Sequence, residues 1–168
     1  MLFIMRGTSC SGKDTFIHTH FPNQNHVLSS DNFREMLLGD RSSQQHNARV
    51  FDMMTEILEI RFINKVNWTV LNATHLRIRD CNQVIELCKK HHVPFTFISI
   101  EPPSVEELVE RNRKRWLMTG MNIPESVLTK HHERYYNNLE NFHKEAIHNP
   151  LCTFIEIDQQ YKVKHELS

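Results

Sequence analysis

The chain lacks several features that would indicate a membrane protein, a secreted protein or a metal-binding module. No apolar run approaches the roughly 18 uncharged residues that a membrane-spanning helix needs. The four cysteines include no C-x-x-C pair, which argues against a zinc site or a redox couple. The apolar start, Met1 to Met5, has neither the basic segment nor the cleavage site of a secretory signal. We therefore expect a soluble, cytoplasmic protein with reduced thiols and no membrane contact.

Excess charge of either sign is also missing, because 20 Lys and Arg residues balance 20 Asp and Glu residues. Such a chain does not bind nucleic acid through its overall charge, although balanced charge does not exclude a local basic cleft. The 168 residues contain no repeat and no low-complexity linker, so we expect a single domain over residues 1–168. The 12 histidines show no metal-ligand spacing, and we interpret them as solvated or helix-face residues.

Apolar periodicity predicts strands that alternate with helices along the whole chain. The expected strands are 2–6, 26–29, 68–71, 94–100 and 152–157. The expected helices are 13–20, 31–38, about 44–66, 79–91, 104 to about 114, and 124–142. This alternation is typical of an α/β fold with a parallel sheet, here of about five strands, that helices cover on both faces. Ligands then bind at the carboxyl ends of the strands.

A glycine-containing segment between the first strand and the first helix matches the phosphate-binding loop G-x-x-x-x-G-K. It reads Gly7, Thr8, Ser9, Cys10, Ser11, Gly12, Lys13, Asp14, Thr15 and contains two of the four glycines of the chain. In such a loop, backbone N–H groups converge on phosphate oxygens and the lysine reaches the β and γ phosphates. The segment therefore predicts binding of ATP or GTP through these nine residues.

The loop departs from the usual motif directly after the lysine. Asp14 occupies the position where a Ser or Thr hydroxyl normally contacts Mg²⁺. The strand at 68–71 is followed by Asn72, where many phosphate-binding-loop proteins carry a metal-binding aspartate. We expect that Asp14 supplies the one carboxylate of a Mg²⁺ site, through water, and that Asn72 holds it by a hydrogen bond. The alternative is two unrelated substitutions.

Two further segments carry charges suited to phosphoryl transfer. Asp31 and Arg34 are three residues apart at the end of the second strand, where they offer a base and a phosphate-binding cation. Arg111 and Arg115 share one face of a later helix. A lid over about residues 111–123 needs this arrangement if it is to clamp the triphosphate. For Asp31 and Arg34, the alternative is a helix cap with an ion pair. For Arg111 and Arg115, it is a solvated basic helix face.

Taken together, these segments resemble the kinase domain of polynucleotide 5′-hydroxyl kinases of phage and bacterial RNA repair, over nearly the whole chain. The resemblance implies that Lys13, Arg111 and Arg115 bind ATP phosphates, with Lys13 and Arg115 acting in catalysis. It implies that Asp31 is the general base and that Arg34 holds the phosphate 3′ to the acceptor nucleotide. From the length we expect no attached phosphatase or ligase domain.

The leading hypothesis is thus an ATP- and Mg²⁺-dependent kinase that phosphorylates the 5′-hydroxyl of RNA or DNA in nucleic-acid repair. A kinase of a nucleotide or another small hydroxylated molecule is the first alternative, because the same groups would serve it. A non-catalytic nucleotide-binding module is the second. The resemblance leaves a homodimer open as well.

Overall fold

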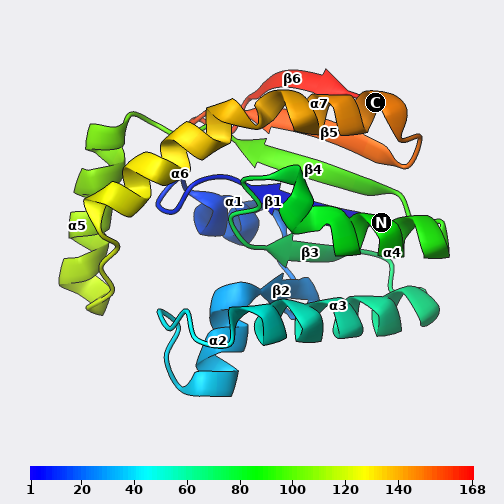
Figure 1. Ribbon diagram of the computed structural model, residues 1–168, viewed down its shortest axis with the longest axis horizontal. Coiled ribbons are helices and arrows are strands. Elements are labelled where there is room, and N and C mark those ends of the chain that lie inside the picture. Colours follow the sequence, from blue (N-terminus) through cyan, green and yellow to red (C-terminus); the bar gives the residue numbers. More distant parts are fainter.

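Six strands form one mixed sheet in the order β2-β3-β1-β4-β5-β6, in a computed structural model that describes all 168 residues (Figure 1). The strands are β1 (Leu2–Arg6), β2 (Val27–Ser29), β3 (Thr69–Asn72), β4 (Phe95–Ile100), β5 (Cys152–Ile157) and β6 (Val163–Leu167). The first five run parallel, and β6 pairs antiparallel with β5. The carboxyl ends of the five parallel strands therefore lie along one edge of the sheet.

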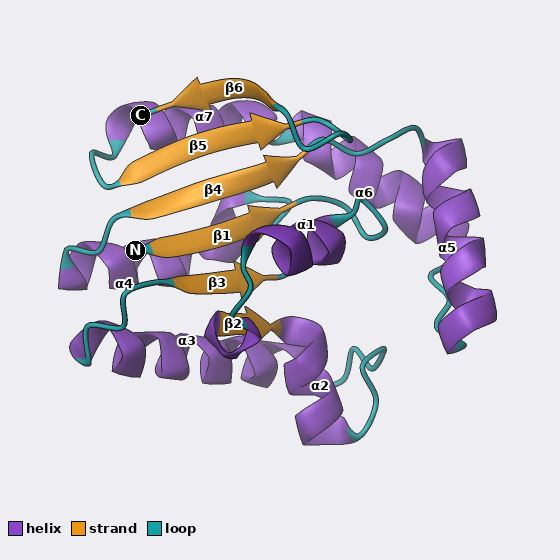
Figure 2. Cartoon of the chain, turned by 180° about the vertical axis from the view of Figure 1, so that it is seen from behind, coloured by secondary structure: helices purple, strands orange, loops and turns teal.

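Helices cover both faces of this sheet. They are α1 (Lys13–His20), α2 (Ser30–Leu38), α3 (Asn47–Ile63), α4 (Asn82–His91), α5 (Val105–Thr119), α6 (Glu125–Asn137) and α7 (Leu139–His148), with short 3-10 helices η1 (Gln24–His26) and η2 (Ile78–Cys81). Helices α3, α4 and α7 lie on one face and α1 lies on the other (Figures 1 and 2). Helix α5 stands beyond the carboxyl edge, and α6 leads back from it towards α7 (Figure 1). No helix has both the length and the apolar character needed to cross a membrane.

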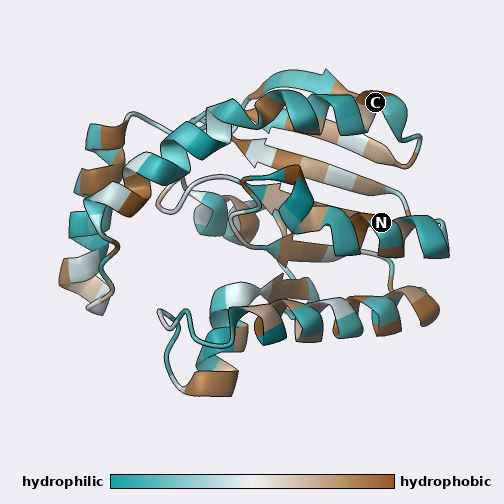
Figure 3. Ribbon diagram, viewed as in Figure 1, coloured by the Kyte–Doolittle hydropathy of each residue, from teal (hydrophilic) through white to brown (hydrophobic).

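The side chains of the five parallel strands are divided between two apolar cores. Leu2 and Ile4 of β1 belong to a cluster of 19 buried residues under α3, α4 and α7. Met5 belongs to a cluster of seven that includes Phe16 and Ile17 of α1. The central strands are mostly apolar, whereas the helices show hydrophilic outer surfaces (Figure 3). With both faces covered, a ligand reaches polar groups of the central strands only at the strand ends.

The predicted α/β fold is confirmed, but the sheet has one strand more than the sequence pattern indicated. The additional strand, β6, is exposed at four of its five residues and lies at the edge of the sheet. A solvated edge strand needs no apolar alternation, and its charged side chains protect it from pairing with other chains. Its sequence therefore carried no signal of a strand.

Two predicted helix boundaries near the carboxyl edge are wrong. Helix α5 continues beyond residue 114 to Thr119, where Gly120 takes a left-handed conformation (φ 72°) and donates its N–H to the Trp116 carbonyl. The single helix expected over 124–142 is divided at Asn138 into α6 and α7. The apolar spacing continues through this break, so periodicity alone did not reveal it.

Candidate active site

The loop from Gly7 to Gly12 joins β1 to α1 at the carboxyl edge of the sheet. Gly12 precedes α1 with a φ of 99°, a conformation that favours glycine. At Gly7 an added Cβ atom would lie 2.8 Å from Ser11 Oγ, so a larger residue would push the loop apart. The Gly7 N–H donates to the Thr74 carbonyl at 3.0 Å, which fixes the loop against the segment after β3. Both glycines of the motif are thus required by the loop geometry.

Lys13 folds back over this loop. Its Nζ donates to the carbonyl oxygens of Gly7 at 3.0 Å and Thr8 at 2.6 Å. Burial lowers the pKa of Lys13 from its ordinary value, and the nearby carboxylates of Asp14 and Asp31 oppose that shift. The hydroxyls of Thr8 and Ser11 are buried without a hydrogen-bond partner. Because buried polar atoms rarely lack a partner, these hydroxyls fit a loop that receives phosphate oxygens.

A cavity of about 410 Å³, here called the smaller cavity, lies against the loop. Its walls are residues 10–15, Arg111 and Arg115 of α5, and Gln159 and Tyr161 of the turn between β5 and β6. The structure thus brings both lid arginines to the loop, although about 100 residues separate them from it in the sequence. This arrangement places three cations, Lys13, Arg111 and Arg115, around the smaller cavity against the single carboxylate of Asp14.

Gln159 and Tyr161 are residues of this site that the sequence did not indicate. Gln159 accepts a hydrogen bond from Arg111 Nη1 at 2.7 Å and donates to the Ser11 carbonyl at 3.3 Å. The Tyr161 hydroxyl donates to the Gly12 carbonyl at 3.2 Å. Both residues depend on the turn that leads into β6, and neither belongs to a recognisable motif. Gln159 therefore connects the loop to Arg111, and Tyr161 supports the loop at Gly12.

Asn112 connects Arg115 to the segment between α5 and α6. The buried amide donates to Asn122 Oδ1 and to the Ile123 carbonyl, both at 2.8 Å. Its Oδ1 accepts from the Ile123 N–H at 3.1 Å and from Arg115 Nη2 at 3.3 Å. Arg115 Nε is buried without a partner, so this guanidinium keeps donor capacity.

A second cavity of about 690 Å³, here called the larger cavity, adjoins the smaller one. Cys10, Lys13, Asp14 and Arg115 line both cavities. The remaining walls come from Ser9, Ser29, α2, the segment 41–44, the start of α3, the end of β3 with the segment after it, residues 121–124, and α6. Two ligands in the two cavities would therefore meet at these four shared residues.

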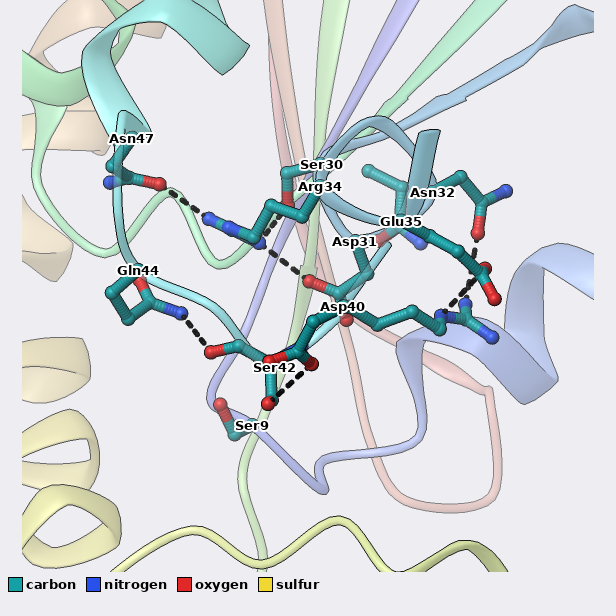
Figure 4. A network of polar contacts seen from close by, with 12 residues as sticks. Ser9, Ser30, Asp31, Asn32, Arg34, Glu35, Asp40, Ser42, Gln44 and Asn47 are labelled. Atoms are coloured by element: carbon teal, nitrogen blue, oxygen red, sulfur yellow. Dashed lines mark hydrogen bonds and ion pairs between the residues drawn. The ribbon is translucent and has the colours of Figure 1, made fainter. Parts of the chain in front are cut away.

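Asp31 and Arg34 of α2 line the larger cavity and contact one another. Arg34 Nη1 donates to Asp31 Oδ1 at 2.7 Å, Nη2 donates to Asn47 Oδ1 at 2.6 Å, and Nη1 also reaches Ser30 Oγ at 3.2 Å (Figure 4). Arg34 is buried with its Nε unpaired, whereas the Asp31 side chain is 51% exposed. A fixed cation thus stands beside an accessible carboxylate, as the sequence spacing led us to expect.

Asp14 and Asn72 meet between the loop and the end of β3. Asn72 Nδ2 donates to Asp14 Oδ1 at 2.7 Å, which is the hydrogen bond expected from the sequence. Asp14 Oδ2 has no partner, and no group of three or more His, Cys, Asp or Glu side chains is arranged around a metal site. One carboxylate fits Mg²⁺, because this ion is commonly held by one or two carboxylates together with substrate phosphates and water.

Two histidines contribute to the walls of the larger cavity. His131 of α6 lies 3.3 Å from Ser9 Oγ through Nδ1, and burial lowers its pKa to about 4. His75 is 4% exposed and donates from Nδ1 to the Met5 carbonyl at 2.8 Å, and burial likewise lowers its pKa to about 4. His75 is therefore a buried residue, and its interpretation as solvated or helix-face is wrong.

Comparisons with known proteins agree with this geometry. The family model described as the AAA domain matches residues 2–138. No match was found among curated proteins. A chain of the Pnkp1/Rnl/Hen1 RNA repair complex superposes with a TM-score of 0.71 at 27% sequence identity, covering 83% of this chain and 45% of that one. Our chain thus spans less than half the length of this structural relative.

Two other solved structures share the fold. A protein from Chloroflexus aurantiacus that is proposed to be a kinase has a TM-score of 0.61 at 21% identity, with 79% of this chain and 78% of that one covered. The AvrRxo1-ORF1:ORF2 complex with ATP has a TM-score of 0.65 at 14% identity, with 94% and 54% covered. The family match over most of the chain and the loop geometry lead to one conclusion. The chain belongs to the AAA domain family and has the fold of a P-loop kinase, which implies ATP binding.

Proposed function

We propose that this protein is an ATP-dependent kinase that transfers the γ-phosphate to the 5′-hydroxyl of a polynucleotide. The observation that carries the proposal is the pair of adjoining cavities with Lys13, Asp14 and Arg115 at their boundary. A donor in the smaller cavity and an acceptor in the larger one would meet beside these side chains. The likeness at 27% identity to a chain of an RNA repair complex supports a nucleic-acid acceptor.

The roles of the loop and lid follow from this placement. Lys13, the loop residues 7–15, Arg111 and Arg115 bind the triphosphate, and Arg115 stabilises the charge that develops on the transferring group. Residues of about 111–123 act as the lid of a single kinase domain over 1–168. Asp14, fixed by Asn72, would hold Mg²⁺ through water, and a bound ion there would supply positive charge to offset the β and γ phosphates.

The acceptor side supplies the proton chemistry. The 5′-hydroxyl oxygen forms a bond with the γ-phosphorus while the bond from that phosphorus to the β,γ-bridging oxygen breaks. The electron pair of the broken bond stays with ADP, and the hydroxyl proton passes to the exposed carboxylate of Asp31. Arg34 binds the phosphate on the 3′ side of the acceptor nucleoside, for which a planar guanidinium is well suited.

Transfer of a radiolabelled γ-phosphate to 5′-hydroxyl RNA, 5′-hydroxyl DNA, nucleosides and nucleotides tests the proposal. We expect labelling of the polynucleotides. Labelling of free nucleosides or nucleotides alone would instead indicate a small-molecule kinase, and ATP binding without transfer to any acceptor would indicate a binding module.

The Asp31→Asn variant tests the assigned base. Its turnover should fall by about 10²–10⁴-fold, the usual contribution of a general base, while its ATP affinity stays close to that of the wild type. Near-normal turnover would show that Asp31 is only the ion-pair partner of Arg34 and not the general base. The same preparations can be examined for a homodimer by light scattering, which checks the self-association implied by the resemblance.

A further inference from the structure

Helix α6 lines the larger cavity with residues at a regular spacing. Pro124, at the start of the helix, is followed by Val127, His131 and Arg134, all of which line the cavity. Their spacing of three or four residues places them on one side of the helix. With a rise of about 1.5 Å per residue, the backbone of Arg134 lies roughly 10 Å further along the helix than that of Val127. The proposed kinase chemistry uses none of these side chains.

The cavity walls carry more positive than negative charge. They include one lysine and five arginines but only three carboxylates, in a chain whose formal net charge is zero. Three of the arginines, namely Arg34, Arg41 and Arg77, each form an ion pair with a carboxylate. Arg115 and Arg134 form none, and Arg115 also lines the smaller cavity. Arg134 is therefore the only arginine without an ion pair that lines the larger cavity alone.

The neighbourhood of Arg134 leaves its charge available. It is an exposed side chain that makes no hydrogen bond to another residue, unlike the guanidinium of Arg77, which is held by Asp80 at 2.8–3.1 Å. His131, one turn earlier, is held uncharged at neutral pH because burial lowers its pKa to about 4. The positive charge on this face of α6 therefore comes from Arg134.

We propose that Arg134 binds a second backbone phosphate of the acceptor, downstream of the phosphate assigned to Arg34. The inference rests on the proposed function and names its substrate more closely, as a nucleic-acid chain of two or more nucleotides. Asp31 and Arg34 occupy the α2 wall of the cavity, and Arg134 occupies the α6 wall. A chain lying between these two walls could contact Arg34 with one phosphate and Arg134 with the next.

Two acceptors that differ by one phosphodiester separate this role from general binding. These are a nucleoside 3′-phosphate and a dinucleotide 3′-phosphate, each with a free 5′-hydroxyl. For Arg134→Ala we expect kcat/KM with the dinucleotide to fall about tenfold, the effect of losing one charged hydrogen bond. The value with the nucleoside 3′-phosphate should change far less. Lys130→Ala is the matched control, because Lys130 is an exposed, unpaired cation one turn earlier on α6 that does not line the cavity.

Salt dependence gives a second measurement. Each phosphate contact with a single strand contributes about 0.7 to the slope of log affinity against log salt concentration. Arg134→Ala should lower the slope for oligonucleotide binding by about that amount, and Lys130→Ala should leave it unchanged. Equal losses for both acceptors, or equal slopes in the two variants, would overturn the second phosphate site while leaving the kinase proposal intact. Absence of transfer to every acceptor by the wild-type protein would overturn the kinase proposal itself.

Discussion

The Asn72 amide donates a 2.7 Å hydrogen bond to the Asp14 carboxylate, and so connects the end of β3 to the first turn of α1. In many phosphate-binding-loop enzymes the residue after the lysine is a hydroxyl and the end of the third strand is acidic. Here the acidic and neutral positions are exchanged. The contact shows that the two positions are neighbours, although 58 residues separate them.

We predict that the double variant Asp14→Ser with Asn72→Asp, which returns the usual residue type to each position, keeps a working metal site, whereas each single variant does not. Asp14→Ser alone should raise the Mg²⁺ concentration needed for half-maximal transfer about tenfold, the usual cost of losing a group that holds the ion through water. Asn72→Asp alone should place two carboxylates in contact, which lowers activity and raises the pKa of one of them. The double variant should recover most of the activity, because residues that share one ion couple strongly. Strictly additive effects in the Mg²⁺ titrations would show that the two positions act independently.

Arg34→Ala should affect acceptors according to their 3′ phosphate. We expect kcat/KM to fall about 10- to 100-fold for acceptors with a 3′ phosphate or phosphodiester, as for the loss of a hydrogen bond between charged groups. The kcat/KM for nucleosides should fall much less. Comparing a nucleoside with its 3′-phosphate measures the difference directly. A uniform loss would instead point to an indirect effect through Asp31, whose carboxylate accepts from the same guanidinium.

Arg115→Ala should lower turnover with every acceptor by about 10²–10³-fold, because the lost charge acts on the transferring group and not on the acceptor. Arg113→Ala is the control on the same helix. Arg113 is an exposed residue paired with Glu110 and lines neither cavity. Single-turnover rates of the two variants provide the comparison, and similar rates would place Arg115 outside the chemical step.

His75 should make stability depend on pH in the acidic range. Burial lowers its pKa to about 4 in the folded chain, against about 6.5 in the unfolded chain. The unfolded state therefore binds the extra proton first, so the full stability is present above pH 6.5 and is lost as the pH falls towards 4. The cost should approach about 3 kcal/mol.

The variant His75→Asn isolates this effect in thermal or urea unfolding measured across the same pH range. His75 has a positive φ of 42°, which asparagine tolerates, and an amide can still donate to the Met5 carbonyl. The variant should show a weaker loss of stability between pH 6.5 and 4. An unchanged pH dependence would assign the effect to other groups.

Much of the site could be predicted from the sequence because its signals are local. The phosphate-binding loop needs glycines at fixed positions and a lysine directly after them, and the structure shows the steric reason at Gly7 and Gly12. The proximity of Asp31 to Arg34 follows from helical spacing alone. The order of strands and helices also followed from apolar periodicity, since each buried element needs an apolar face.

Contacts between distant segments were decided by the tertiary structure. Gln159 and Tyr161 reach the loop because the turn into β6 folds over the loop. The sequence did not indicate this turn, because an exposed edge strand such as β6 needs no apolar pattern. The packing of α6 beside the carboxyl edge of the sheet brings His131 and Arg134 to the larger cavity (Figure 1). Local sequence determines the conformation of a turn or a helix, but only the packing of the whole sheet and its helices decides which side chains meet.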